Sequence, residues 1–219
     1  MHIQPKAVIE LFTSQGCSSC PPADALIEQL AKRDDLVTLA YHVDYWDYIG
    51  WTDTFGASSN SDLQRDYAQS WGSSRIYTPQ LIVNGAHGVV ASKKAEVDQA
   101  LSKATLQLPV MLSTEGGVLS VSINGKAGIA ANAVVWLITF RDRADVEMER
   151  GENQGKSITY TPIVTARQVL AMWESSTGAH FKLPLAEVIT GKSTGAAIVV
   201  QEDKGGLPGP ILGAASFDL

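Results

Sequence analysis

The chain contains only two cysteines, and they lie three positions apart at the end of a mostly apolar segment. Cys17 and Cys20 follow residues 8–12, whose composition suits a buried strand. The small and polar residues 14–16 end that strand, and residues 23–30 then show the apolar spacing of a helix. The sequence therefore predicts a strand, a turn and a helix with both sulfur atoms at the turn.

Two cysteines separated by two residues have a characteristic chemistry. Both sulfur atoms can reach one face of a turn and form a disulfide, while a following helix offers its N-terminal N–H groups and partial positive charge to a thiolate. Thiols in such surroundings have pKa values of about 3.5 to 7.5, against about 8.5 for free cysteine. We expect Cys17, which is nearer the turn and more exposed, to attack a substrate, and Cys20 to resolve the mixed disulfide.

Composition narrows the class of protein. With 219 residues, of which 45% are hydrophobic, the chain can fill one large core or two smaller ones, and we expect two domains. A formal net charge of -6 argues against nucleic acid as a partner. No apolar run reaches the roughly 18 residues of a membrane helix. The first strand begins too early to leave room for a signal peptide, so we expect a trimmed mature chain, periplasmic or secreted, or alternatively a cytoplasmic protein.

The segment after the second predicted strand is unusually aromatic. Residues 62–71 have helical spacing, with Asn60 or Ser61 as the expected N-cap. The rings either form the wall of a substrate groove beside the cysteines or pack the segment onto the sheet, and packing is the commoner role of large aromatic residues. The aromatic residues of this segment, residues 44–75, are Tyr45, Trp46, Tyr48, Trp51, Phe55, Tyr67 and Trp71.

A hairpin is predicted over residues 76–90. Asn84 and Gly85 are the residue types that a tight two-residue turn prefers. Before the first strand of this hairpin stands Pro79, preceded by Thr78. Because proline cannot donate a hydrogen bond to a sheet, this step indicates an edge, a bulge or a cis peptide bond.

The order of these elements resembles the thioredoxin superfamily over about residues 5–106. A strand, a C-x-x-C turn, a helix, a second strand, a Thr-Pro step, a hairpin and an amphipathic helix at residues 93–104 follow one another. The resemblance implies a cis-proline facing the cysteines, and it makes Tyr77, Thr78 and Pro79 the candidate substrate-binding residues.

A second resemblance covers the whole chain. The strings ELFTSQGCSSCPPAD and RGENQGKS resemble a bacterial family of thioredoxin-like proteins of unknown function, many of them predicted to be secreted. This resemblance implies a fold and a compartment, but no substrate.

The chain departs from the superfamily pattern near the cysteines. Gly16 stands where an aromatic residue usually precedes the first cysteine. Pro21 and Pro22 predict that the regular helix begins there with Ser19 as its cap, which leaves the first cysteine outside the helix. Glu10 is the candidate proton relay, although it lies one residue away from the usual place, and the alternative is a carboxylate in an ion pair or at an exposed edge.

Alternating strand patterns dominate after residue 108. Short strands separated by glycine-rich turns indicate a β-sandwich. The predicted fold is therefore an α/β thioredoxin-like domain with an aromatic-rich insertion at residues 1–106, followed by an all-β, sandwich-like domain at residues 107–219. The strand candidates are residues 110–115, 118–124, 133–140, 146–150, 157–161, 163–173, 180–185, 196–203 and 210–217.

Two polar patterns favour structural roles. Residues 151–157 look like a phosphate-binding loop but lack one residue between the glycines and precede a strand rather than a helix. We expect this loop to brace the two domains against each other. His42 with Asp44 and Asp47 has a metal-like composition, but no second ligand cluster has zinc-type spacing, and we expect no metal site. The expected bracing residues are Arg150, Glu152, Asn153 and Lys156.

Three functions remain open from the sequence. The first is a thiol-disulfide oxidoreductase that acts on protein or peptide thiols and disulfides without a cofactor. The second is a Cu(I) relay through the same two cysteines, with a histidine or methionine as third ligand. The third is a binding module on an inherited redox scaffold. Neither the direction of the redox reaction nor the oligomeric state follows from the sequence.

Overall fold

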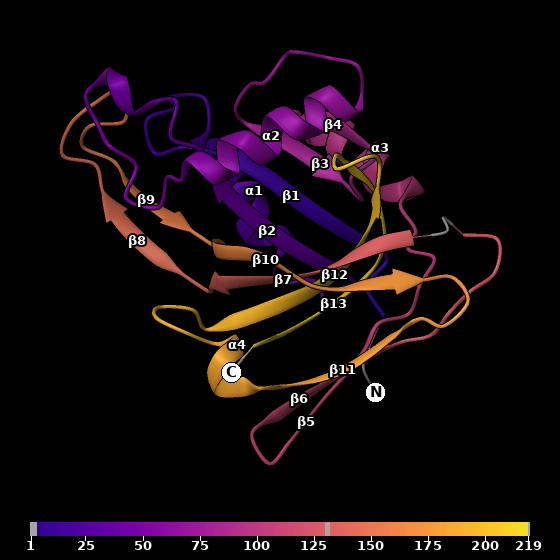
Figure 1. Cartoon of the computed structure of the whole chain (residues 1–219). Coiled ribbons are helices and arrows are strands. Elements are labelled where there is room, and N and C mark those ends of the chain that lie inside the picture. Colours follow the sequence, from indigo (N-terminus) through magenta and orange to yellow (C-terminus); the bar gives the residue numbers. More distant parts are fainter. Residues whose placement is uncertain (1–3, 130–131, 219) are drawn as a thin grey trace.

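One mixed sheet of eight strands runs through the whole molecule (Figure 1), in the order β13-β12-β7-β10-β2-β1-β3-β4. The structure is a computed structural model that describes residues 4–129 and 132–218. None of its helices in these ranges is long and apolar enough to cross a membrane. The strands of this sheet are β1 (Ala7–Thr13), β2 (Leu36–His42), β3 (Gln80–Val83), β4 (His87–Val90), β7 (Asn132–Arg141), β10 (Ile163–Glu174), β12 (Gly195–Asp203) and β13 (Pro208–Asp218).

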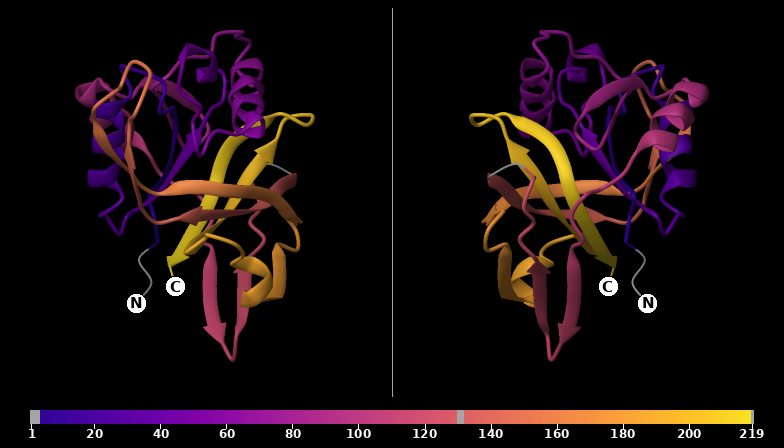
Figure 2. Two further views of the ribbon diagram at one scale, coloured as in Figure 1. Left: turned by 90° about the vertical axis from the view of Figure 1, so that its left-hand side faces the viewer. Right: turned by 90° about the vertical axis from the view of Figure 1, so that its right-hand side faces the viewer.

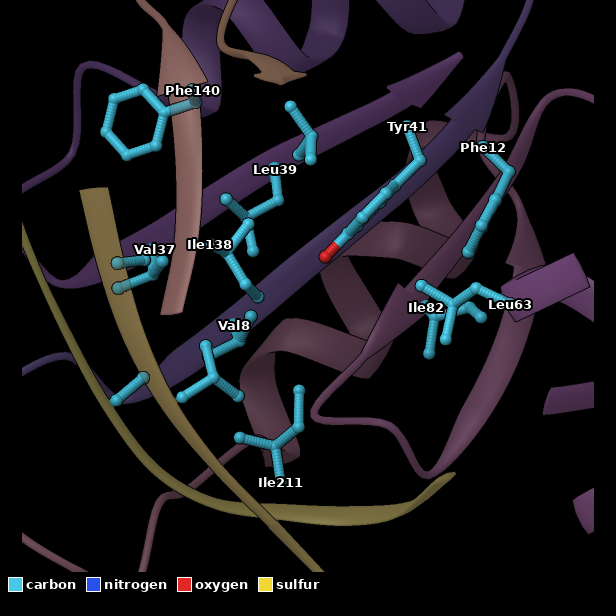
Figure 3. Close-up of a cluster of buried hydrophobic side chains, with 14 of the residues drawn as sticks. Val8, Phe12, Val37, Leu39, Tyr41, Leu63, Ile82, Ile138, Phe140 and Ile211 are labelled. Atoms are coloured by element: carbon cyan, nitrogen blue, oxygen red, sulfur yellow. The ribbon is translucent and has the colours of Figure 1, made fainter. Parts of the chain in front are cut away.

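Strand β1 is covered on both faces, as its nearly continuous apolar sequence requires. It pairs with β2 in parallel and with β3 in antiparallel orientation. On one face, Ile9 and Leu11 pack against helices α1 (Pro21–Leu30) and α3 (Lys94–Lys103). On the other face, Val8 and Phe12 pack toward helix α2 (Ser58–Ser70), as the core view in Figure 3 shows. The two faces of β1 therefore point into two separate cores.

The sheet continues from the first half of the chain into the second. Strand β10 joins β2 in parallel at Ile163 and Ala40, and it then pairs along its length with β7. The core on the α2 side contains Val37 and Leu39 from β2 together with Ile138 from β7. The sheet therefore passes over the predicted boundary at residue 106. The division into a thioredoxin-like domain and a separate sandwich-like domain stays a prediction.

Two smaller sheets complete the second half. Strands β5 (Met111–Glu115), β6 (Val118–Ile123) and β11 (Ala179–Pro184) form one, and its inner residues pack with those of β7 and β12. The side views in Figure 2 place this sheet and α4 (Leu185–Val188) at the end of the molecule away from α1 and α2. Strands β8 (Ala144–Glu147) and β9 (Ser157–Tyr160) form the other. Eight of the nine strands predicted in the second half are thereby confirmed. The strand predicted at residues 146–150 lies instead at residues 144–147, as β8, and α4 is an addition.

The predicted hairpin is also confirmed, in a shorter form. It consists of β3 and β4, and its turn residues Asn84 and Gly85 both have positive φ, at 50° and 64°. Type I′ turns require positive φ at both central residues, which explains the Asn-Gly pair. The peptide bond between Thr78 and Pro79, just before β3, is cis.

The predicted N-caps of two helices are wrong. Helix α2 begins at Ser58 with Ala57 at its cap position, because the side chains of Asn60 and Ser61 bond to the end of β2 and to Asp44 instead. Helix α1 begins at Pro21 as expected, but its cap position is Cys20 rather than Ser19. The carbonyl of Cys20 accepts the first N–H groups of the helix, from Ala23 and Asp24.

Candidate functional site

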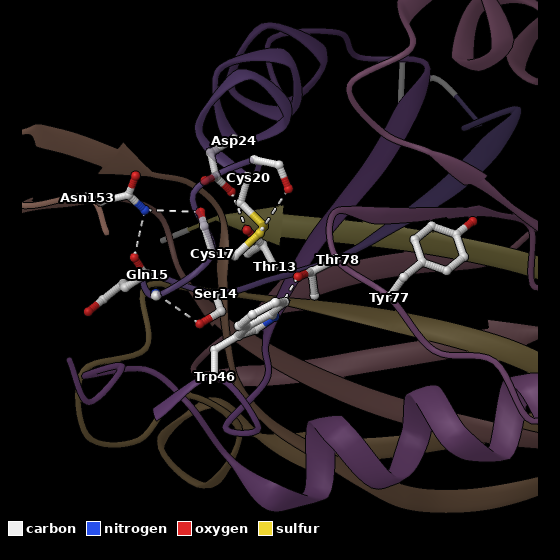
Figure 4. The surroundings of a disulfide bond; sticks show 12 residues. Thr13, Ser14, Gln15, Cys17, Cys20, Asp24, Trp46, Tyr77, Thr78 and Asn153 are labelled. Atoms are coloured by element: carbon white, nitrogen blue, oxygen red, sulfur yellow. Dashed lines mark hydrogen bonds between the residues drawn. A yellow bond between two sulfur atoms is a disulfide. The ribbon is translucent and has the colours of Figure 1, made fainter. Parts of the chain in front are cut away.

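A disulfide joins Cys17 and Cys20 at the turn between β1 and α1 (Figure 4). Their Cα atoms are 5.4 Å apart. The backbone forms consecutive tight turns, in which Cys17 N donates to Ser14 O and Cys20 N donates to Cys17 O. The strand-turn-helix prediction for this segment is confirmed, and Cys20 lies at the positive end of α1 while Cys17 lies outside it.

The disulfide is buried, which differs from the expected exposure of Cys17. The exposed fraction is 1% for Cys17 and 0% for Cys20. Only the two serines between them, Ser18 and Ser19, are exposed in this turn. A reagent must therefore displace some part of the protein before it reaches either sulfur atom.

Trp46, from the aromatic segment, forms one part of the cover, the group of side chains that shields the disulfide from solvent. Its indole Nε1 donates to Thr78 Oγ1 at 2.7 Å, so it links the cysteine side of the site to the cis-proline step. Figure 4 shows this pair beside the disulfide, with Asp24 on the other side. A Cβ atom on Gly16 would lie 3.2 Å from the Cβ of Trp46. The Cβ atom and the backbone of Trp46 therefore leave little room for a side chain at position 16.

Asn153, from the loop between β8 and β9, holds the turn itself. Its side chain is 1% exposed, and its amide Nδ2 donates to Gln15 O at 2.9 Å and to Cys17 O at 3.0 Å. Lys156 Nζ donates to Asn153 Oδ1 at 2.8 Å and fixes the orientation of this amide. The loop that the sequence predicts as a brace between two domains thus contacts the cysteine turn directly.

Gln15 links the cysteine turn by hydrogen bonds to residues 51–54. Its backbone N–H donates to Asp53 Oδ2 at 2.8 Å, and its side-chain Oε1 accepts from Trp51 Nε1 at 2.8 Å. Its Nε2 donates to Thr54 Oγ1 at 2.9 Å. The aromatic rings of residues 44–57 thus mainly pack and brace, while Trp46 also bonds to Thr78.

The predicted substrate-binding residues lie on the segment that leads into β3. Thr78 is half-buried and engaged by Trp46, and Pro79 is buried, with its carbonyl accepting from Ala91 N. Tyr77 offers its carbonyl to Gln64 Nε2, and its ring lies away from the disulfide in Figure 4. The structure therefore brings Thr78 to the site and leaves the Tyr77 ring outside it.

Asp24 is the carboxyl group nearest to the cysteines along the helix, and the sequence reasoning missed it. It is 2% exposed, its backbone N–H donates to Cys20 O, and its Oδ1 accepts from the Thr13 hydroxyl at 2.7 Å. Burial raises the pKa of Asp24 to about 7, and the bond from Thr13 and the charge of His42 oppose this rise only in part. Asp24 stands four positions after Cys20, and this spacing was the available signal.

Glu10, the predicted proton relay, lies in a different environment. Its side chain points to the α2 face of β1, where its Oε2 accepts from the Tyr67 hydroxyl at 2.5 Å. Burial raises the pKa of Glu10, while the bond from Tyr67 and the charge of Arg167 oppose the rise. Thr13 and Asp24 lie on the opposite, α1 face. A proton role at the cysteines therefore fits Asp24 better than Glu10.

His42 does not combine with Asp44 and Asp47. Its Nδ1 bonds to Asp53 Oδ2 at 2.8 Å, while Asp44 accepts from Ser61. Within residues 4–129 and 132–218, no group of three or more His, Cys, Asp or Glu side chains is arranged to hold a metal ion.

If Trp46 closes the site, weakening its bond to Thr78 will make the disulfide easier to reduce. Trp46→Phe and Thr78→Val each remove this bond, which is worth about 1 kcal/mol, so the rate of reduction by dithiothreitol should rise about fivefold in each. Stopped-flow measurement of the reduction rate tests this. The double variant should gain no more than either single variant, and Trp71→Phe, in a ring that packs on Tyr67, is the control. Fully additive gains would show that the two residues act separately.

The raised pKa of Asp24 predicts a pH dependence of stability. Because the folded protein holds this proton more tightly than the unfolded chain, the stabilisation is complete below about pH 4 and is lost as the pH rises through about 7. Asp24→Asn keeps the acceptor for Thr13 and removes this dependence. Relative to that variant, the wild type should lose on the order of 2–4 kcal/mol between pH 4 and 8, measured by urea unfolding. Parallel curves for the two proteins over this range would contradict it.

One family model and two solved structures are similar to the chain. The model of the family described as "Protein of unknown function (DUF1223)" matches residues 8–201. A crystal structure of a protein from Agrobacterium tumefaciens is similar with a TM-score of 0.87 and 32% identity, covering 99% of this chain and 96% of that chain. HBP35 of Porphyromonas gingivalis is similar in fold, with a TM-score of 0.64 and 14% identity over 99% of this chain and 76% of that chain. No protein with a curated description matches the chain. The chain therefore belongs to the DUF1223 family.

Proposed function

We propose that the protein is a thiol-disulfide oxidoreductase with a thioredoxin-like N-terminal domain, acting on protein or peptide substrates through Cys17 and Cys20. The observation that carries the proposal is the position of the disulfide. It lies at the N-terminus of α1, with the Asp24 carboxyl on one side and the Thr78-Pro79 cis peptide on the segment bonded to Trp46. A disulfide that served only to brace a loop would need neither the Asp24 carboxyl nor the cis peptide beside it.

The proposed chemical steps take Cys17, which lies outside α1, as the attacking residue and Cys20, at the start of α1, as the resolving residue. In the reduced protein, the Cys17 thiolate attacks a substrate disulfide, a bond forms between Cys17 and one substrate sulfur, and the other substrate sulfur leaves as a thiolate. The Cys20 thiol then gives its proton to Asp24, and its thiolate attacks Cys17 Sγ. The Cys17–Cys20 bond forms, the bond to the substrate breaks, and the substrate leaves reduced while the protein is oxidised. The reverse sequence oxidises a substrate dithiol.

Asp24 suits the proton step because its pKa lies near neutral pH. A carboxyl group with a pKa of about 7 accepts a proton from a thiol and releases it again at little cost. An ordinary aspartate, with a pKa near 3.9, would hold that proton too weakly. Its place one helical turn after Cys20 puts it with the resolving cysteine rather than with the attacking one.

Access to the sulfur atoms requires the cover to move. The bond between Trp46 and Thr78 is the part of the cover that can open without disturbing the turn, since Asn153 and Gln15 hold the backbone of the turn separately. A substrate chain that pairs with the backbone next to Pro79 would take the place of the indole. The binding energy of the substrate would then supply the cost of opening.

A second candidate function is supported by the burial of the cysteines. A disulfide with 1% exposure at Cys17 fits a binding module that retains a redox scaffold without turnover. The third alternative, a Cu(I) relay, would use the two thiolates of the reduced protein together with a further ligand. Within the part of the chain that the structure describes, no His, Asp or Glu side chain forms a metal-binding group of three with them.

We also propose a periplasmic or secreted location, with the cytoplasm as the alternative. Disulfides form and persist in oxidising compartments, and a closed Cys17–Cys20 bond is the state expected there. In the cytoplasm, the same pair would stay reduced and act as a reductant.

The oxidoreductase proposal predicts different effects for the two cysteines. Wild-type protein should catalyse insulin reduction by dithiothreitol, and Cys17→Ser should abolish the reaction because no attacking thiol remains. Cys20→Ser should accumulate a mixed disulfide with a peptide substrate, detectable by mass spectrometry under non-reducing conditions. Ser18→Ala is the matched control, since this exposed hydroxyl lies in the same turn.

Activity that survived in Cys17→Ser would refute the assigned order. Wild-type protein that neither reduces insulin nor oxidises a reduced peptide, yet binds a partner equally well as the Cys17→Ser/Cys20→Ser double variant, would favour the binding module. Stoichiometric Cu(I) uptake that survives a competing chelator would favour the metal relay. The reduction potential of the pair decides between the reductive and oxidative directions.

A further inference from the structure

Strand β10 leaves one of its two edges unpaired over most of its length. It pairs with β7 from Ile163 to Glu174, whereas its pairing with β2 consists of Ile163 and Ala40 alone. The far end of this edge is occupied by a bridge between Glu174 and Gly178. Between these points, at residues 165–173, no other described strand pairs with this open edge, and the course of β10 along β7 can be followed in Figure 1. An open edge presents N–H and C=O groups that can bind another extended chain.

The open edge is regular over its middle part. The pairing of β10 with β7 shifts its register between Val164 and Ala166 and again between Val169 and Ala171. Such irregularities twist a strand and hinder the pairing of a further chain. Residues 166–169, which lie between the two shifts, keep a continuous register with β7 and form a stretch as long as β3 or β4. This stretch can therefore pair with a short extended segment.

A groove of about 420 Å³ runs beside the first part of the open edge. One of its walls is residues 163–167 of β10, and the other is formed by residues 54–63, from the loop before α2 and from α2 itself. This second wall is fixed to the end of β2, because Ala57 N and Asn60 Nδ2 both donate to His42 O. Among the described residues that line the groove, Arg167 alone carries a charge.

Arg167 presents a guanidinium group that is held in place. Its Nη2 donates to Gln201 Oε1 at 2.9 Å, and its guanidinium carbon lies 3.4 Å from the centre of the Trp136 ring. Gln201 Nε2 donates to the Tyr67 hydroxyl at 2.7 Å, and this hydroxyl donates to Glu10. A ligand that binds Arg167 therefore meets a group whose orientation is already fixed, which reduces the entropy cost of binding.

The charge of Arg167 lacks a carboxylate partner. Its Nε is fully buried without a hydrogen-bond partner, and within residues 4–129 and 132–218 its guanidinium takes part in no ion pair. Glu10 reaches it only through the chain of hydrogen bonds just described. Asp66, Glu202 and Asp203 line a second hollow next to Arg167 but form no ion pair with it. Because a guanidinium group binds carboxylates well, a carboxylate in the groove would supply the partner that is lacking.

Two apolar side chains extend this surface along β10. Of the four large hydrophobic residues that are exposed in the described part of the chain, two are on β10: Val169 at 56% and Met172 at 51%. Directly paired residues of two strands lie on the same face of a sheet. Arg167, Val169 and Met172 pair with residues 138, 136 and 134 of β7, which alternate along that strand, so the three side chains share one face. Side chains of an added strand would contact this face.

We propose that residues 166–169 of β10 bind an extended segment of a partner polypeptide as an added strand, with an acidic side chain of that segment at Arg167. The open backbone edge supplies the strand pairing, and Val169 and Met172 contact apolar side chains of the segment. Arg167 makes the site selective for a carboxylate. The cysteines take no part in this binding, so the proposal goes beyond the oxidoreductase function and does not depend on it.

The test uses a set of capped peptides of about eight residues, with alternating valine and threonine and one glutamate placed at each position in turn. At least one peptide of the set should bind the wild-type protein in isothermal titration calorimetry. The same peptide with glutamine should bind about tenfold more weakly, because a charge-assisted hydrogen bond is lost. Methylation of alternate backbone N–H groups of the peptide should abolish binding in one phase and spare it in the other, since only alternate residues of a strand pair with one neighbour.

Two variants place the peptide on β10. Arg167→Gln should abolish the preference for glutamate over glutamine. Because Arg167 also bonds to Gln201, Val169→Glu tests the same surface at an exposed position, and it should weaken binding of the glutamate peptide about threefold through like charge. His87→Glu is the matched control, since it adds an acidic residue at an exposed position of β4, at one end of the sheet order, and should leave binding unchanged.

Four results would overturn the proposal. The first is failure of every peptide in the set to bind the wild-type protein at about 1 mM. The second is equal binding of the glutamate and glutamine peptides, and the third is binding that N-methylation does not affect in either phase. The fourth is self-association of the wild type in sedimentation velocity that Val169→Glu abolishes, because the open edge would then belong to a second copy of the chain. None of these measurements involves the cysteines, so a failed oxidoreductase assay leaves their outcome unchanged.

Discussion

The amide of Asn153 is the contact on which the geometry of the cysteine turn depends. It satisfies the carbonyls of Gln15 and Cys17, residues 138 and 136 positions earlier in the chain. Both carbonyls are buried, and a buried carbonyl without a donor costs about as much as a lost hydrogen bond. The loop between β8 and β9, in the second half of the chain, thereby completes a site whose chemistry lies in the first half. The eight-stranded sheet places the two halves so that this contact forms.

Burial removes water from around the turn, and this has two consequences. Removal of water from around Asp24 disfavours its charged form and brings its pKa to about 7. The same removal of water closes the disulfide to reagents. An exposed dithiol at this turn would react faster, but its neighbouring carboxyl would ionise near pH 4 and make a poor proton acceptor for a thiol. A cover that opens for a substrate and closes afterwards allows both reactivity and proton transfer.

Local sequence patterns predicted the parts of the site that short-range physics determines. The apolar run before the cysteines, the prolines after them and the Asn-Gly turn of the hairpin each fix a conformation through neighbouring residues. The site contacts of Asn153 and Asp53 were not predictable in this way. Their partners are residues 136–138 and 38 positions away, so only the packed sheet brings them together. Asp24 is an intermediate case, because its place four positions after Cys20 can be read from the sequence but its burial cannot.

The glycine at position 16 also has a physical explanation in the cover. Trp46 approaches Gly16 from a separate segment, and a Cβ atom at position 16 would lie 3.2 Å from the Cβ of Trp46, a tight contact that requires a small shift. The ring is held by one hydrogen bond to Thr78, whereas Gln15 and Asn153 hold the turn by several. We infer that this separation of cover from turn lets the site open at Trp46 while the sulfur atoms, Asp24 and His42 keep their positions.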